Sequence, residues 1–82
     1  MAKSFHVGIY SKDKIVYEGK AIYLVAPSVE GSLGILADHA AMVVKLLNGK
    51  ITLRTPDGNI SLIDSSGNGF LEVLHNQVTL LL

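Results

Sequence analysis

Residues 48–64 read NGKITLRTPDGNISLID, and this segment carries the clearest secondary-structure signal in the chain. Residues 50–55 alternate between apolar and polar side chains, which is typical of a strand with one buried face. The turn signal Pro56-Asp57-Gly58 follows, because proline fixes φ at the first corner and glycine accepts a left-handed conformation. Residues 59–64 then return as the partner strand. Asn48-Gly49 is a second strong turn dipeptide, so the segment predicts two hairpins, one at each turn.

Similar short apolar patterns extend toward both ends of the chain. Gly19 and Pro27 are expected to end two strands, because glycine weakens a strand and proline cannot donate to a sheet ladder. The strand before Pro27 is expected to be buried on both faces near its end. The last two strands are predicted to pair around residues 75–77. Outside the opening segment, strands are predicted over residues 4–10, 15–18, 21–26, 70–74 and 78–82.

Residues 39–47 fit two patterns. Ala40, Val43, Val44 and Leu47 fit a helical stripe, whereas alternate residues fit a strand face. The segment is short and ends at a turn dipeptide, so a strand is predicted.

Frequent turn signals and short strands favour one all-β domain over residues 1–82, a small antiparallel β-sandwich of roughly eight to ten short strands. The chain has 82 residues, of which 49% are hydrophobic. The free energy gained by burying a core of this size barely exceeds the cost in chain entropy, so contact with a partner is expected to add stability. The core is predicted to contain Val7, Ile9, Ile22, Leu24, Val44, Leu53, Leu62, Phe70, Val73 and Leu80.

The composition excludes several classes of protein. Seven basic side chains balance seven acidic ones, and a neutral chain is a poor binder of nucleic acid. Cysteine is absent, which excludes disulfides and thiolate sites. The unbroken apolar runs, such as residues 40–44, are far too short to span a membrane. No targeting segment is evident, so the protein is expected to be soluble and to reach a membrane only through a partner.

No pattern of catalytic residues is present. His6, His39 and His75 lie far apart and lack the spacing of metal ligands. The carboxylates show no hydrolase pairing, and no phosphate-binding loop occurs. The chain is therefore predicted to be a non-enzyme without metal or cofactor. His39 is expected to hold the shape of its loop through a bond from a ring nitrogen to a loop carbonyl.

Residues 30–40, EGSLGILADHA, are unusual because two glycines and several polar groups alternate with bare aliphatic side chains. Two interpretations remain open. The stretch is either a surface binding loop or a crossing between two sheets whose aliphatic side chains close one end of the core.

This stretch resembles the signature loop of the epsilon subunit of F-type ATP synthases, through the pattern Glu-Gly-x-Leu-Gly-Ile-Leu-x-x-His-Ala. Supporting matches cover nearly the whole chain in the same order. They are Val16-Tyr17-Glu18-Gly19, Gly69-Phe70-Leu71-Glu72-Val73 and Asn76-Gln77-Val78-Thr79.

The resemblance implies the β-sandwich domain of a non-catalytic rotor subunit in the central stalk. Such a domain docks the gamma subunit onto the membrane c-ring and couples proton flow to ATP synthesis. It would lie peripherally on the cytoplasmic face of the bacterial inner membrane or on the equivalent organelle membrane. The c-ring-facing loop implied by the matching motif comprises Glu30, Gly31, Ser32, Leu33, Gly34, Ile35 and His39.

The chain departs from the family pattern at a few positions. Ser32 replaces a common acid, Asp38 and Ala41 replace a glycine and a proline, and Asn68 is inserted in a glycine pair. Longer members continue beyond the position of Leu82 into a regulatory helical hairpin. The present chain is therefore expected to support assembly and coupling without binding ATP. The alternative is an unrelated small ligand- or protein-binding sandwich. The scarcity of aromatic residues argues against a carbohydrate module in particular.

Overall fold

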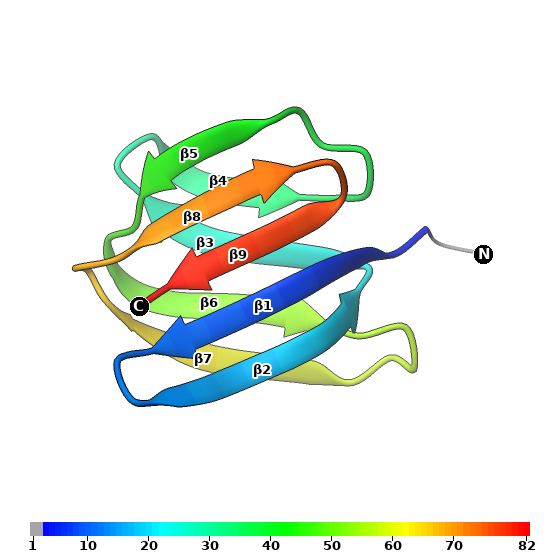
Figure 1. The fold of residues 1–82 in the computed structure, drawn as a ribbon, viewed down its shortest axis with the longest axis horizontal. Coiled ribbons are helices and arrows are strands. Elements are labelled where there is room, and N and C mark those ends of the chain that lie inside the picture. Colours follow the sequence, from blue (N-terminus) through cyan, green and yellow to red (C-terminus); the bar gives the residue numbers. More distant parts are fainter. Residues whose placement is uncertain (1–2) are drawn as a thin grey trace.

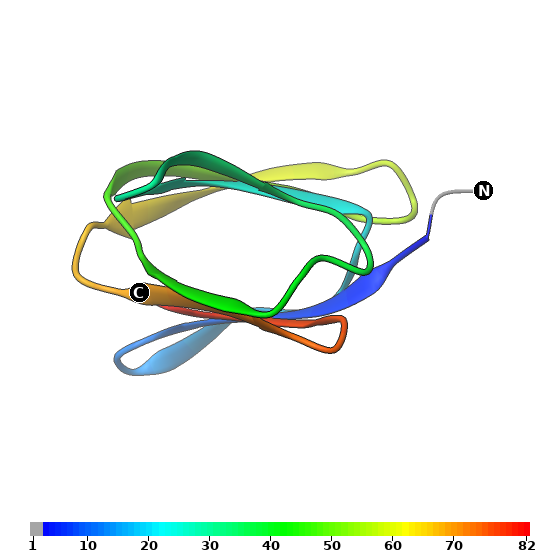
Figure 2. The same cartoon turned by 90° about the horizontal axis from the view of Figure 1, so that it is seen from above.

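The computed structural model describes residues 3–82, which form two β-sheets packed face to face (Figures 1 and 2). The five-stranded sheet has the order β2-β1-β9-β8-β5, and the four-stranded sheet has the order β4-β3-β6-β7. The strands are β1 (Phe5–Ser11), β2 (Lys14–Ala21), β3 (Tyr23–Ser28), β4 (Gly31–Ile35), β5 (Met42–Lys45), β6 (Asn48–Arg54), β7 (Ile60–Ser66), β8 (Phe70–Leu74) and β9 (Gln77–Leu81).

The predicted β-sandwich is confirmed, with one difference in strand direction. All neighbouring strands pair antiparallel except β1 and β9, which run parallel in the middle of the five-stranded sheet. The first and last strands of the described chain therefore lie side by side (Figure 1).

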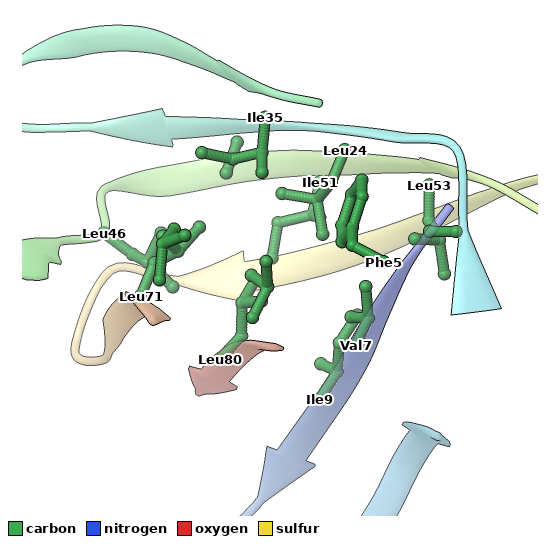
Figure 3. Close-up of a cluster of buried hydrophobic side chains, with 14 of the residues drawn as sticks. Phe5, Val7, Ile9, Leu24, Ile35, Leu46, Ile51, Leu53, Leu71 and Leu80 are labelled. Carbon is green, nitrogen blue, oxygen red and sulfur yellow. The ribbon is translucent and has the colours of Figure 1, made fainter. Parts of the chain in front are cut away.

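The hydrophobic core fills the space between the sheets, where alternate side chains of both inner faces meet (Figure 3). Its central members include Phe5, Ile9, Leu24, Ile51 and Leu80, each with no more than 2% of its surface exposed. The remaining buried hydrophobic residues are Val7, Ala21, Ala26, Ile35, Val44, Leu46, Leu53, Leu71, Val73 and Val78.

Three of the predicted core residues were wrong. Leu62 and Phe70 are 64% and 49% exposed, and Ile22 is only half-buried between β2 and β3. Phe70 and Val73 are three residues apart in one strand, so they cannot share a face. Leu62 pairs with Thr52, whereas buried Leu53 pairs with Ser61, so Leu62 points to the opposite side of the sheet from Leu53.

The predicted hairpin at Asn48-Gly49 was also wrong. Both residues lie inside β6, where they pair with Ser66 and Ser65 of β7. The preceding strand β5 belongs to the other sheet. Gly49 is needed for close packing, because a Cβ there would lie 3.0 Å from the ring of Pro27. Its lack of a side chain therefore serves a contact between strands.

The other two predicted turns are confirmed. In the β6–β7 turn, the Thr55 N–H donates to the Asn59 carbonyl, and Gly58 takes a left-handed φ of 92°. In the β8–β9 turn, His75 and Asn76 have φ values of 49° and 58°, which is the two-residue geometry that fits the twist of a hairpin. Residues 42–45 form a strand, as predicted for the ambiguous segment.

Two strands continue past their predicted ends. β2 continues through Gly19 to Ala21, and β3 continues through Pro27 to Ser28. The ladder between β3 and β6 ends at Val25, before Pro27. The Pro27 carbonyl points to the β6 side of β3 and accepts from the Leu47 N–H. The missing N–H of Pro27 therefore faces a side where the ladder has already ended, so no ladder hydrogen bond is lost. Burial in β3 alternates, which contradicts the prediction of burial on both faces.

Candidate functional site

The stretch over residues 30–40 is not a single loop. Glu30 lies in the tight turn between β3 and β4, residues 31–35 form the edge strand β4, and residues 36–41 connect β4 to β5 in the other sheet. The turn and the connection lie at opposite ends of the sandwich (Figure 1). The strand between them spans about 13 Å at the usual rise per residue.

The seven predicted site residues are therefore separated by the fold. Glu30, Gly31 and Ser32 are exposed together at the β3–β4 turn. Along β4, Leu33 packs partly against the core, and Ile35 is buried in it. Gly34 is exposed, and His39 lies at the far end of the molecule in the β4–β5 connection.

Ser28 fixes the β3–β4 turn from inside. It has 1% of its surface exposed, and its hydroxyl donates to the Gly31 carbonyl at 2.8 Å. The Glu30 N–H donates to the Ser28 Oγ at 3.1 Å. Gly31 has a φ of 102°, a conformation that favours glycine. The turn therefore presents the Glu30 carboxylate on a constrained backbone.

At the other end, Asp38 contacts two segments that are distant in sequence. The Asn76 Nδ2 donates to the Asp38 Oδ1 at 2.9 Å, and the Asp38 N–H donates to the Asn76 Oδ1 at 2.6 Å. The Lys3 ammonium lies 3.1 Å from the Asp38 Oδ2. The hydrogen bond from Asn76, followed by that from Lys3, holds the pKa of Asp38 below its usual value.

His39 and His75 border a shallow hollow of about 390 Å³ at this end, together with Asp38, Ala41 and Asn76. The His39 Nδ1 lies 2.8 Å from the Ala40 carbonyl, which agrees with the predicted bond from the ring to a loop carbonyl. Within residues 3–82, no group of three histidine or acidic residues has the geometry of a metal site.

Sequence reasoning missed Lys3, His75 and Asn76 as neighbours of the β4–β5 connection. It also missed an apolar row on the outer face of the five-stranded sheet. Phe70, Leu81 and Ile15 are 49%, 54% and 60% exposed. Phe70 pairs with Leu81, Leu81 with Tyr10, and Tyr10 with Ile15. The alternation of β8 could have indicated that Phe70 points outward, opposite to Leu71 and Val73.

The outer face of the four-stranded sheet also carries apolar groups. Ile60 and Leu62 are 56% and 64% exposed, and a shallow hollow of about 510 Å³ lies beside them in the sheet, lined by Tyr23, Val25, Gly34, Leu36 and Thr52 among others. The sandwich therefore has exposed apolar surface on both of its outer faces, which is typical of a domain that contacts other proteins.

Comparison with protein families matches residues 4–82 to the family described as the ATP synthase delta/epsilon chain β-sandwich domain. The ATP synthase epsilon chain of Natranaerobius thermophilus is 37% identical over 79 residues, covering 96% of this chain and 56% of that protein. The epsilon chain of an Exiguobacterium species is 43% identical over 76 residues, covering 93% and 55%. The chain thus spans a little over half the length of these curated relatives.

Solved structures with the same fold include one chain from the Euglena gracilis mitochondrial ATP synthase, with a TM-score of 0.84 and 21% identity over 92% of this chain and 48% of that chain. A chain from the central stalk and c-ring structure of the Tetrahymena thermophila mitochondrial ATP synthase gives a TM-score of 0.79, 21% identity, and coverage of 98% and 63%. In the part of the chain that the structure describes, no helix is long and apolar enough to cross a membrane.

Proposed function

Because the chain belongs to the ATP synthase delta/epsilon β-sandwich family, we propose that it acts as a non-catalytic rotor subunit of an F-type ATP synthase. The observation that carries this proposal is the family match, which covers residues 4–82. The proposed role is to dock the gamma subunit onto the c-ring and thereby to couple proton flow to ATP synthesis. The central stalk and c-ring named for the Tetrahymena structure support the same assignment.

Membrane association would then occur through the complex. The proposed location is peripheral, on the cytoplasmic face of the bacterial inner membrane or on the equivalent organelle membrane. The exposed apolar side chains on both outer faces support a role in contacting other subunits.

For the c-ring contact, the geometry favours the β3–β4 turn over the rest of the predicted loop. Glu30, Gly31 and Ser32 are exposed there. The Glu30 carboxylate makes no ion pair or hydrogen bond with any other described residue, whereas Asp38 is already bound to Lys3. A free carboxylate on a constrained turn is available to a basic or polar loop of the ring.

A charge reversal at Glu30 tests this contact. Glu30→Arg is expected to weaken c-ring binding about fivefold, because the loss of an exposed ion pair costs up to about 1 kcal/mol. The measurement is proton-driven ATP synthesis in membranes carrying the complete enzyme. Lys20→Glu, an exposed reversal at the end of β2, is the matched control. Equal synthesis by both variants and by the wild type would overturn the proposed contact.

For gamma, we infer contact with the outer face of the five-stranded sheet, through the row of Phe70, Leu81, Tyr10 and Ile15. The row crosses four neighbouring strands and so offers one continuous apolar strip. Phe70→Asp is expected to reduce co-purification with gamma several-fold, and Leu62→Asp on the opposite outer face should have little effect. The reverse order of effects would move the interface to the four-stranded sheet.

A further inference from the structure

Three segments that are far apart in sequence meet at one end of the sandwich. They are the residues before β1, the β4–β5 connection and the β8–β9 turn (Figure 1). Asp38 joins them, through the Lys3 ammonium at 3.1 Å and through two hydrogen bonds with Asn76. The two bonds are reciprocal, because each residue both donates to and accepts from the other.

The β4–β5 connection has few other means of holding its shape. Outside the strand ladders, residues 36–41 make no backbone–backbone hydrogen bonds within the described part of the chain. Asp38 has a φ of 65°, a left-handed conformation that is unfavourable for residues with a side chain. Aspartate and asparagine tolerate this conformation best, because their short polar side chains form local hydrogen bonds. Here the compensating bonds come from a remote turn.

Asn76 is a firm anchor for these bonds. It occupies the second position of the two-residue β8–β9 turn, with a φ of 58°. Its carbonyl accepts the His6 N–H at 2.9 Å, which ties the turn to β1. The side-chain amide therefore projects from a backbone held by a hairpin on one side and by a neighbouring strand on the other.

We propose that Asp38 and Asn76 form a clamp that positions the β4–β5 connection and, with it, His39. The clamp joins a crossing between the two sheets to a turn between two interior strands of the five-stranded sheet. It makes the β8–β9 turn part of the surface at this end, where His75 and His39 border one hollow. The clamp does not depend on which subunit binds this surface, so it can be tested separately from the proposed rotor role.

The first test is amide hydrogen exchange of the Asp38 N–H in the 82-residue chain, followed by NMR. Asn76→Gly keeps a residue that tolerates the left-handed turn but removes the side-chain amide. Exchange at Asp38 is expected to accelerate about tenfold, the factor that corresponds to one ordinary hydrogen bond. His75→Gly makes the same change at the adjacent turn position and should leave this amide unchanged. No acceleration in Asn76→Gly, or equal acceleration in both variants, would overturn the clamp.

The second test exchanges the two side chains. Asn76→Asp alone keeps an oxygen that can accept the Asp38 N–H but replaces the amide donor with a second carboxylate, so the two side chains repel and Asp38 exchange should be faster than in the wild type. Adding Asp38→Asn restores an amide facing a carboxylate, with the donor now on the β4–β5 connection. In the double variant, exchange at residue 38 should return to within about threefold of the wild type, as expected for residues coupled by direct contact. Exchange as fast as in Asn76→Asp would show that the two side chains do not act as a pair.

Discussion

The two ends of β4 are held in different ways. At its start, the turn depends on buried groups: Ser28 is 1% exposed and pairs with Leu46, which is fully buried. At its end, the chain depends on exposed side chains, because those of Lys3 and Asp38 keep 79% and 59% of their surface accessible. Buried polar groups and close contacts are costly to disturb, whereas exposed pairs contribute little free energy. We therefore expect the first end to govern stability and the second to govern local shape.

The largest effect is expected at Gly69, which belongs to the buried end because its carbonyl accepts the Leu46 N–H. A Cβ at this position would lie 1.6 Å from the carbonyl oxygen of Leu81. Gly69→Ala should lower the free energy of unfolding by about 3 kcal/mol or more, since backbone must move to accommodate it. Urea denaturation measures the loss. Gly34→Ala, where no atom lies within 4 Å of the added carbon, should change stability by less than about 0.5 kcal/mol.

A smaller loss is expected from Ser28→Ala. The substitution removes a buried hydroxyl that accepts the Glu30 N–H and donates to the Gly31 carbonyl. The free energy of unfolding should fall by about 1–3 kcal/mol, as measured by chemical denaturation. Ser66→Ala, at an exposed position at the end of β7, is the control. A similar loss in both variants would remove the distinction between buried and exposed groups.

At the exposed end, Asp38→Ala and Asp38→Gly should both keep the fold, but they should differ in melting temperature. Both remove the bonds to Lys3 and Asn76, but only alanine keeps a side chain in the left-handed conformation. The melting temperature should therefore fall further for Asp38→Ala than for Asp38→Gly, with both losses smaller than that of Ser28→Ala. Thermal unfolding followed by circular dichroism gives this order directly.

The smallest effect concerns pH. The pKa of Asp38 is lowered in the folded state, first by the hydrogen bond from Asn76 and then by Lys3. Its contribution to stability is therefore present above the pKa of the unfolded chain, near 3.9 for aspartate, and is lost as the pH falls through the folded pKa. The urea midpoints of the wild type and Asp38→Asn should differ slightly at pH 7 and converge in acid. A constant difference would mean that the Asp38 charge does not contribute.

The contrast between the two ends also explains what the sequence could predict. The β6–β7 hairpin was predictable because its strands and turn are adjacent in residues 50–64, and their pattern reflects local conformation. Asn48-Gly49 misled the prediction because the glycine serves close packing against Pro27, which lies in another strand, and not a turn. The error at Phe70 was avoidable, because Phe70 shares a face of β8 with Glu72, whereas Leu71 and Val73 share the other face.

In the candidate site, too, local features were predictable and contacts between distant segments were not. The motif in residues 30–40 identified the family, and the exposed β3–β4 turn lies within it. The pattern did not indicate that β4 separates Glu30 from His39, since bare aliphatic side chains fit an edge strand as well as a loop. Asn76 could not be predicted as the partner of Asp38, because 38 residues separate them and no local pattern links two turns at that distance.

The parallel pairing of β1 with β9 has a consequence for the order in which the protein is assembled. The strands of the four-stranded sheet all lie between Tyr23 and Ser66, so that sheet can form while the chain is still being synthesised. The β1–β2 hairpin is made earlier but must wait for the last strand before its inner edge is paired. Contacts between such distant segments slow folding. During synthesis, the nascent chain therefore exposes an open strand edge beside Phe5, Val7 and Ile9 until β9 emerges, which is when association with the wrong partner is most probable.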